Sequence, residues 1–242
     1  MKNIENDIRD ILCTPTGETF ITRYYICLRL LKIHKYFKNN YASTKNIRCL
    51  DVGCNAGYFS KIVADMGINV DAIDNNTGEI NYPNVQYYNT DIQNFSPHFT
   101  YDIILLFDVY EHISIEDRPL VLKKIYGLLK ENGVLIFSGP NCISPLYGAG
   151  YCKEKFINII NTTNYFNWHY HISSLSYKNI FKSSNFIIDQ WCTNGTLPMI
   201  SDKFEQLPYK YIRYLIHIDK ILSPIFKGLG ANYYCIMHKN KT

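Results

Sequence analysis

Leu50-Asp51-Val52-Gly53-Cys54-Asn55-Ala56-Gly57-Tyr58-Phe59 joins an apolar strand pattern to an amphipathic helix pattern through a turn with two glycines. Upstream, Ile47 to Val52 predicts a short buried strand. Downstream, four apolar residues recur on one face of a helix: Phe59, Ile62, Val63 and Met66. Glycines in such a turn let a ligand approach the backbone closely, beside a helix N-terminus. The stretch is typical of a nucleotide-type cofactor site.

Acidic residues at strand ends narrow the kind of cofactor. Asp51, before the turn, repels a pyrophosphate and favours a ligand with a positive end, and the G-x-G-x-x-G spacing of dinucleotide dehydrogenases is absent. Asp74 ends the second predicted strand, where it can accept both hydroxyls of a ribose, and Asp91 ends the third, where it can meet an adenine amino group. The alternative is that these acids only cap helices or solvate loops.

Strand and helix patterns alternate from Ile47 to Phe137. After the first strand, further strands are predicted at 68–73, 85–88, 103–107 and 134–137. A helix is predicted from about Ile115 to Lys130, stopped by Asn132-Gly133. The apolar run at 103–107 suits a parallel strand buried on both faces. This alternation predicts an α/β fold built on a doubly wound parallel sheet.

The rest of the chain is less regular. Helices are predicted for Phe20–Phe37, from Ser174, and for Tyr209–Leu222, and strands for Phe186–Trp191 and Tyr233–Met237. Without a repeat or linker, we expect one domain with peripheral helical additions. Its expected parts are an N-terminal helical segment (1–45), a cofactor-binding core (46–193), a helical insertion or lid (194–230) and a last strand (231–242).

The amino-acid composition indicates the broad class of protein. The 242 residues are 47% hydrophobic and 19% charged, which is ordinary for a globular protein. A net charge of +4 without a run of like charge argues against a nucleic-acid binder, so we expect no DNA partner, and RNA has only weak support. Eight scattered cysteines without a C-x-x-C pair argue against zinc and indicate reduced core thiols. With no signal core and no long apolar stretch, we expect a soluble cytoplasmic protein.

The chain resembles the class I S-adenosylmethionine-dependent methyltransferases in several motifs. Residues 51–57 are similar to the D-x-G-x-G-x-G of that family, and residues 101–113 are similar to its fourth strand and following turn. Residues 128–141 are similar to the LKPGGxLxxSxPN of the ubiquinone-biosynthesis-like O-methyltransferase branch, and His171 through Phe186 to its approach to the sixth strand. The match covers about residues 46 to 193 and a last strand near 231 to 238.

The resemblance implies a fold, a cofactor and the residues that bind it. The fold is a Rossmann-like seven-stranded sheet, mostly parallel with an antiparallel last strand. The cofactor is S-adenosyl-L-methionine. By position, the residues implied to bind it are Asp51, Gly53, Cys54, Asn55, Gly57, Asp74, Asn75, Asp91, Ile92 and Phe107. Asn55 replaces the central glycine of the family, but asparagine also adopts a positive φ readily, so the turn can survive. Glu131 and Asn132 replace its Pro-Gly in a surface turn.

Candidate catalytic residues follow the fourth strand. Methyl transfer to a hydroxyl removes a proton, so a base or a metal helps. By resemblance, Glu111 and His112 orient or deprotonate the acceptor, with His171 as a further candidate and Asp108 and His169 nearby. A divalent metal is left open. The alternatives are that Glu111 and His112 only pack the turn and that the later histidines are structural. Four aromatic residues could line an acceptor pocket or simply pack: Tyr147, Tyr151, Tyr165 and Trp168.

These features predict a methyltransferase that methylates a hydroxyl of a small molecule, either a sugar or glycan or a phenol-like ring. RNA methylation and a catalytically silent relative are the alternatives. The basic segment Lys210–Leu222 has three interpretations: a lid over the site, a peripheral contact with an anionic membrane, or plain packing on the sheet. The oligomeric state is not predicted.

Overall fold

The computed structural model describes residues 4–13, 20–41, 44, 46–75, 78, 80–141, 144, 172, 174–196 and 207–240. The helices are α1 (Ile4–Cys13), α2 (Phe20–Asn40), α3 (Tyr58–Asp65), the short 3-10 helix η1 (Tyr110–His112), α4 (Arg118–Leu128), α6 (Ser174–Ser183) and α7 (Tyr209–Ile225). The strands are β1 (Arg48–Val52), β2 (Asn69–Asp74), β3 (Val85–Asn89), β4 (Tyr101–Phe107), β5 (Leu129–Pro140), β6 (Phe186–Asn194) and β7 (Asn232–Lys239). Each strand predicted from the sequence is present.

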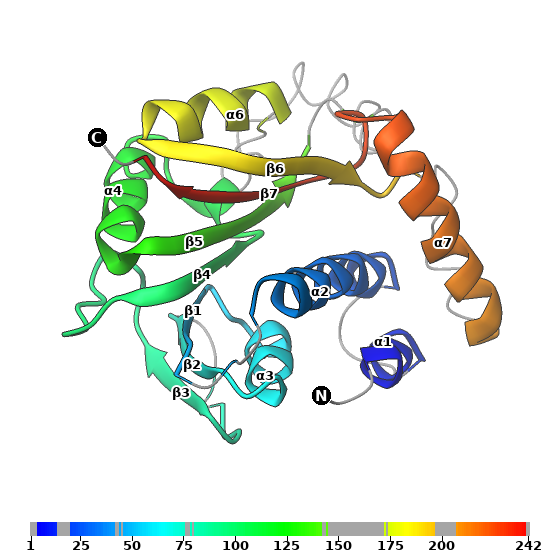
Figure 1. Cartoon of the computed structure of the whole chain (residues 1–242), viewed down its shortest axis with the longest axis horizontal. Helices are drawn as coiled ribbons and strands as arrows, with labels where there is room; N and C mark the ends of the chain where they lie inside the picture. Colours follow the sequence, from blue (N-terminus) through cyan, green and yellow to red (C-terminus); the bar gives the residue numbers. More distant parts are fainter. Residues whose placement is uncertain are drawn as a thin grey trace, which may run out of the picture.

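The strands form one sheet in the order β3-β2-β1-β4-β5-β7-β6 (Figure 1). Strands β1 to β5 pair in parallel, whereas β7 runs antiparallel to both β5 and β6. The chain builds outward from β1 to β3 and then returns to β4 on the other side of β1. The predicted Rossmann-like, doubly wound sheet with an antiparallel last strand is confirmed, and its switch point lies between β1 and β4.

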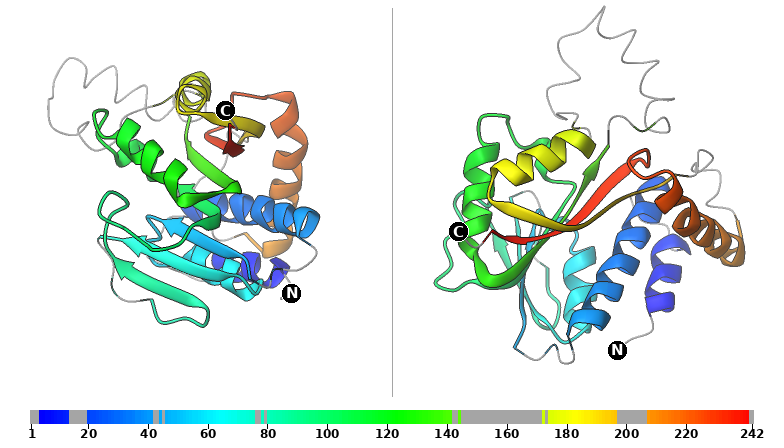
Figure 2. Two further views of the ribbon diagram at one scale, coloured as in Figure 1. Left: turned by 60° about the vertical axis from the view of Figure 1, so that its left-hand side comes forward. Right: turned by 45° about the horizontal axis from the view of Figure 1, so that its top comes forward.

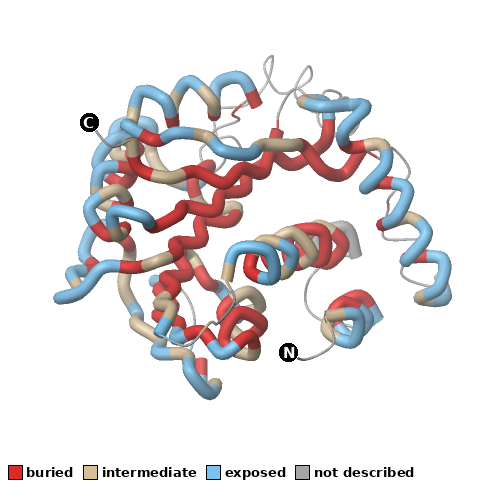
Figure 3. Tube along the Cα trace, in the orientation of Figure 1, coloured by how far each residue is buried: buried red, intermediate tan, exposed pale blue. Residues whose placement is uncertain are grey.

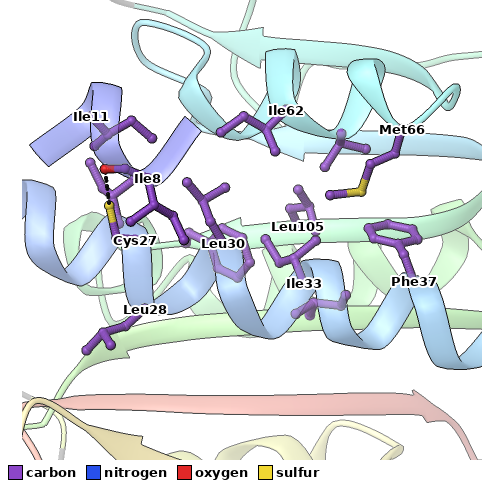
Figure 4. Close-up of a cluster of buried hydrophobic side chains, with 14 of the residues drawn as sticks. Ile8, Ile11, Cys27, Leu28, Leu30, Ile33, Phe37, Ile62, Met66 and Leu105 are labelled. Atoms are coloured by element: carbon purple, nitrogen blue, oxygen red, sulfur yellow. Dashed lines mark hydrogen bonds between the residues drawn. The ribbon is translucent and has the colours of Figure 1, made fainter. Parts of the chain in front are cut away.

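Helices α1, α2 and α3 lie on one side of the sheet, where their side chains form a shared apolar core (Figure 4). Leu30 and Ile33 of α2 are fully buried against this face, and Cys27 lies close to the backbone of α1. Helix α2, predicted as a helical addition at the N-terminus, thus forms part of the core. The helix is apolar on more than one side because it packs between the sheet and α1 (Figure 1).

Helices α4 and α6 cover the opposite face (Figure 2). Val121, Leu122 and Ile125 of α4 are buried, as their spacing predicts. From α6, the rings of Tyr177 and Phe181 contact Phe137 of β5 at centroid distances of 4.9 and 4.8 Å. The central strands are buried along most of their length (Figure 3), as expected for strands that are covered on both faces.

The junction of α4 and β5 differs from the prediction. Helix α4 ends at Leu128, before the predicted stop, and β5 begins at once because Leu129 pairs with Tyr101. The pairing then shifts register before Val134 meets β4. A Cβ on Gly133 would lie 2.8 Å from the Tyr101 carbonyl oxygen. This glycine therefore permits close approach of two backbones at an irregular pairing, and it does not end the helix.

Helix α7 lies at the margin of the molecule in every view, beside α1 and the end of β6 (Figures 1 and 2). It extends three residues beyond the predicted end at Leu222. No helix in the described part of the chain is long and apolar enough to cross a bilayer.

Candidate functional site

Several strands end level with one another at one edge of the sheet. Val52 of β1 pairs with Ile73 of β2 and with Leu106 of β4, and Leu106 pairs with Phe137 of β5. The residues that come next along these segments form one row: Gly53, Asp74, Phe107 and Ser138. The row crosses the switch point between β1 and β4, where sheets of this kind bind ligands. The topology therefore brings the predicted cofactor motifs to one place.

The turn after β1 has a left-handed backbone at three residues. Gly53, Asn55 and Gly57 have φ angles of 68°, 45° and 75°. The amides of Gly53 and Cys54 both donate hydrogen bonds to the Ile73 carbonyl, at 2.9 and 3.1 Å. These bonds tie the turn to β2, and α3 begins directly after Gly57.

The turn has no room for side chains at its glycines. A Cβ on Gly53 would clash with Val109, and one on Gly57 would lie 2.8 Å from Ile80. Asn55 is exposed and keeps the left-handed conformation that asparagine adopts more readily than other non-glycine residues. The replaced glycine of the motif therefore leaves the shape of the turn intact.

Asp51 lies beneath the turn. Its carboxylate is buried and accepts a hydrogen bond from the Ser60 hydroxyl of α3 at 2.5 Å. Burial raises its pKa to about 6, and the hydrogen bonds from Ser60 act in the opposite direction. In the structure, Asp51 joins the end of β1 to α3 through this hydrogen bond. Its role in binding the cofactor stays a prediction.

Asp74 is joined to the turn directly. Its carboxylate accepts a hydrogen bond from the Asn55 amide at 3.0 Å, and its carbonyl accepts one from the Tyr87 hydroxyl, also at 3.0 Å. The Asp74 side chain is partly exposed at the edge, and Asn75 beside it is exposed. The two motifs that the sequence linked across 19 residues are thus in contact.

The remaining predicted cofactor residues flank this contact. Asp91 holds its own turn, because its two carboxylate oxygens accept hydrogen bonds from the backbone and side-chain nitrogens of Asn94 at 2.8 and 2.9 Å. Ile92 and Cys54 are buried. Phe107 is also buried, and its ring lies 4.7 Å, between centroids, from that of Phe59 in α3.

Asp108, directly after β4, connects three elements. It has a φ of 53°, which is uncommon for a residue with a side chain, and such strain clusters at functional sites. Its amide donates a hydrogen bond to the Ser138 carbonyl at 2.9 Å. Its Oδ2 lies 2.5 Å from Nη2 of Arg29, a buried residue of α2 that also donates to Asn232 at 3.2 Å. Helix α2 therefore contributes a cation to the edge.

Glu111 is a second buried acid near this edge, after Asp51. It lies in η1, only 3% exposed, and its Oε2 has no hydrogen-bond partner among the described residues. Burial, and next the charge of Asp108, raise its pKa well above the ordinary value, whereas Arg29 and Arg118 lower it. His112 follows Glu111 in the chain but is exposed. The two predicted catalytic neighbours thus occupy different environments.

Tyr177 of α6 brings a hydroxyl to the same neighbourhood. Its ring stacks on Tyr233 at 5.3 Å between centroids, and a Cβ on Gly139 of β5 would clash with its hydroxyl. Neither that hydroxyl nor the Ser138 hydroxyl has a hydrogen-bond partner in the described part of the chain. Burial raises the pKa of Tyr177, and the charges of Glu111 and Asp108 raise it further. Tyr177 therefore keeps its proton and can donate a hydrogen bond.

Some predicted residues lie outside the described ranges. They are His169 and His171 and the aromatic residues Tyr147, Tyr151, Tyr165 and Trp168. Within those ranges, no three histidine, cysteine or acidic side chains lie close enough together to hold a metal ion.

A family model described as a methyltransferase domain matches residues 22–190. This chain belongs to the class I S-adenosylmethionine-dependent methyltransferases. Its strand order and antiparallel β7 are those of the class. The match begins within α2, so the family model includes the helix that supplies Arg29.

Relatives and solved structures agree with the family. The ubiquinone biosynthesis O-methyltransferase of Rickettsia felis is 27% identical over 150 residues, covering 58% of this chain and 61% of the relative. The chain thus spans about three fifths of the length of that relative. The magnesium protoporphyrin IX methyltransferase of Synechocystis, solved with bound S-adenosylhomocysteine, matches with a TM-score of 0.60 and 14% identity, over 97% of this chain and 93% of that one. A methyltransferase of Archaeoglobus fulgidus matches with a TM-score of 0.55 and 18% identity, over 87% and 94%.

Two residues at this edge of the sheet, Arg29 and Tyr177, were not singled out by the sequence motifs. Arg29 lies in α2, far upstream of the cofactor motifs, and Tyr177 lies among the many tyrosines of the chain. The only available signal was the spacing that makes α2 and α6 pack on the sheet. Which residue of each helix reaches the carboxyl edge depends on the packing.

Proposed function

We propose that this methyltransferase transfers the methyl group of S-adenosylmethionine to a hydroxyl oxygen of a small molecule, either a sugar or glycan or a phenol-like ring. Family membership and the name of the Rickettsia relative support the reaction class. The observation that carries the choice of oxygen is the buried Oε2 of Glu111 at the carboxyl edge of the sheet, which has no hydrogen-bond partner among the residues that the structure describes.

The residues of the edge fit the cofactor that the family uses. S-adenosylmethionine supplies an activated methyl group on a sulfonium sulfur. Asp74, partly exposed beside the turn, is the proposed acceptor of hydrogen bonds from the ribose hydroxyls. The turn itself brings backbone close to a ligand at the N-terminus of α3, where its glycines carry no side chain. Within the expected core of residues 46–193, Asp91, Ile92 and Phe107 flank the same position.

Glu111 is the proposed proton acceptor. Methyl transfer to a hydroxyl oxygen releases one proton, and a carboxylate without a hydrogen-bond partner can take it. The raised pKa makes Glu111 a stronger base than an ordinary carboxylate once it is ionised. Tyr177 retains its own proton, so it is suited to donate a hydrogen bond that orients the acceptor. Arg29 and Arg118 partly offset the charge that forms on Glu111.

The pH dependence of methyl transfer tests this proposal. Radiolabelled S-adenosylmethionine is offered with catechol and with methyl glucoside, for the wild type, Glu111→Gln and the exposed control Glu116→Gln. We expect transfer to one acceptor, with a rate that rises with pH as Glu111 loses its proton. Glu111→Gln should lower the rate by about 100-fold and remove the rise, while S-adenosylhomocysteine still binds. A Glu111→Gln rate and pH profile equal to those of the wild type would refute the role of Glu111.

A further inference from the structure

Helix α7 is anchored to the body of the protein by one face. Ile212, Ile216 and Asp219 are buried on that face. Asp219 accepts hydrogen bonds from the amides of Gly195 and Thr196 at 3.2 and 2.6 Å and from the Thr196 hydroxyl at 2.8 Å. These contacts hold the helix in one orientation. They therefore determine which of its side chains face outward.

That outer face is apolar. Five large side chains recur at intervals of three and four residues and are 41–68% exposed: Tyr211, Tyr214, Ile218, Ile221 and Ile225. We call these five residues the outer stripe. Phe226 and Leu229, also exposed, follow it. Of the twelve exposed large apolar side chains in the described part of the chain, seven lie between 211 and 229. Such a concentration marks an interaction surface.

Basic residues border the outer stripe on one side. Lys210, Arg213, His217 and Lys220 line a cleft of about 540 Å³ between α7 and α1, and the two lysines and the arginine carry its positive charge. Glu5 is the acid of this lining, and it forms an ion pair with Arg213 at 3.2 Å. Partial burial and the nearby charges of Lys35 and Lys32 lower the pKa of Lys220. Positive charge thus exceeds negative charge along this border.

We propose that α7 docks this protein on an anionic phospholipid surface. In this arrangement the outer stripe enters the boundary between headgroups and acyl chains, and the cations of the cleft meet lipid phosphates. An apolar face with a basic border is the pattern of helices that lie in the membrane plane. Plain packing, one interpretation of this segment from the sequence, accounts for the buried face alone.

A second copy of the chain fits the surface less well. In a two-fold dimer in which the two α7 helices run antiparallel, the basic borders of both copies lie on the same side of the contact and face each other. The repulsion between these borders opposes the contact, whereas anionic lipid neutralises both. Charge complementarity therefore selects the lipid surface.

Co-sedimentation with vesicles tests the proposal. We expect the wild type to bind vesicles of phosphatidylcholine with phosphatidylglycerol at least tenfold more strongly than vesicles of phosphatidylcholine alone. Ile218→Ser/Ile221→Ser should reduce that binding at least tenfold. Lys210→Glu/Lys220→Glu, which keeps the outer stripe, should remove the preference for the anionic vesicles.

The matched control is Leu120→Ser/Leu175→Ser, which changes two apolar residues of α4 and α6 that are more exposed than Ile218 and Ile221, and which should bind as the wild type does. Circular dichroism melts confirm that each variant is folded. Absence of wild-type binding to the anionic vesicles would overturn the proposal, as would equal loss in the control. A dimer in light scattering that Ile218→Ser/Ile221→Ser dissociates would show instead that the face joins two copies.

Discussion

Nη2 of Arg29 lies 2.5 Å from Oδ2 of Asp108, an ion pair that joins a helix near the start of the chain to the residue directly after β4. Arg29 is buried, and Asp108 has a left-handed backbone. The pair therefore ties α2 to the carboxyl edge of the sheet, where the cofactor motifs meet.

Replacing Arg29 by Met should destabilise the protein. The change leaves the Asp108 carboxylate and the Asn232 side chain without their buried cation, so we expect a loss of about 2 kcal/mol in the free energy of unfolding. Urea denaturation measures this loss. Lys130→Met, which removes the more exposed pair with Asp102, should cost less than about 1 kcal/mol. Equal losses in the free energy of unfolding for the two variants would show that the ion pair of Arg29 with Asp108 stabilises the fold no more than an exposed pair does.

Asp51 should make stability depend on pH. Its pKa rises from an ordinary value near 4 to about 6 on folding, so between these pH values the folded state holds a proton that the unfolded state has released. Stability must therefore fall as pH rises through this window, by up to about 3 kcal/mol. Asp51→Asn should lack this component of the pH dependence in urea denaturation at pH 4 to 7. Parallel profiles for the variant and the wild type would contradict the raised pKa.

Asn55 should be replaceable by glycine but not by alanine. Its φ of 45° strains any residue with a Cβ, and asparagine tolerates that strain better than alanine does. We expect Asn55→Ala to lower the free energy of unfolding by about 1 kcal/mol, and Asn55→Gly to leave it nearly unchanged. Thermal melts of the two variants give the comparison. An alanine variant as stable as the glycine variant would mean that the turn relaxes to another shape.

The sequence predicts the sheet well because its central strands are buried on both faces and read as apolar runs. Ile103–Phe107 shows this most clearly. It predicts the cofactor edge for a related reason, since residues that end parallel strands must meet at one edge. Asp74 and the Asn55 amide, 19 residues apart, lie 3.0 Å from each other as that rule requires.

Features that depend on packing between distant segments were not predictable. Asn132-Gly133 is a typical helix stop, yet Gly133 serves the close approach of β5 to Tyr101. Arg29 reaches Asp108 only because α2 packs against the sheet at one particular rotation. The outer stripe of α7 was not predictable either. The sequence pattern of that segment did not show which of its apolar sides packs against the rest of the protein.

Calorimetric titration with S-adenosylhomocysteine is the most direct test of the cofactor site at the carboxyl edge of the sheet. We predict one site per chain, with binding weakened by roughly 1–3 kcal/mol in Asp74→Ala, because the variant loses the charge-assisted bonds to ribose that we propose for this carboxylate. Asp102→Asn, at the opposite end of β4, should bind as the wild type does. The absence of binding to the wild type at millimolar ligand, or unchanged affinity in Asp74→Ala, would contradict the site described at the carboxyl edge of the sheet.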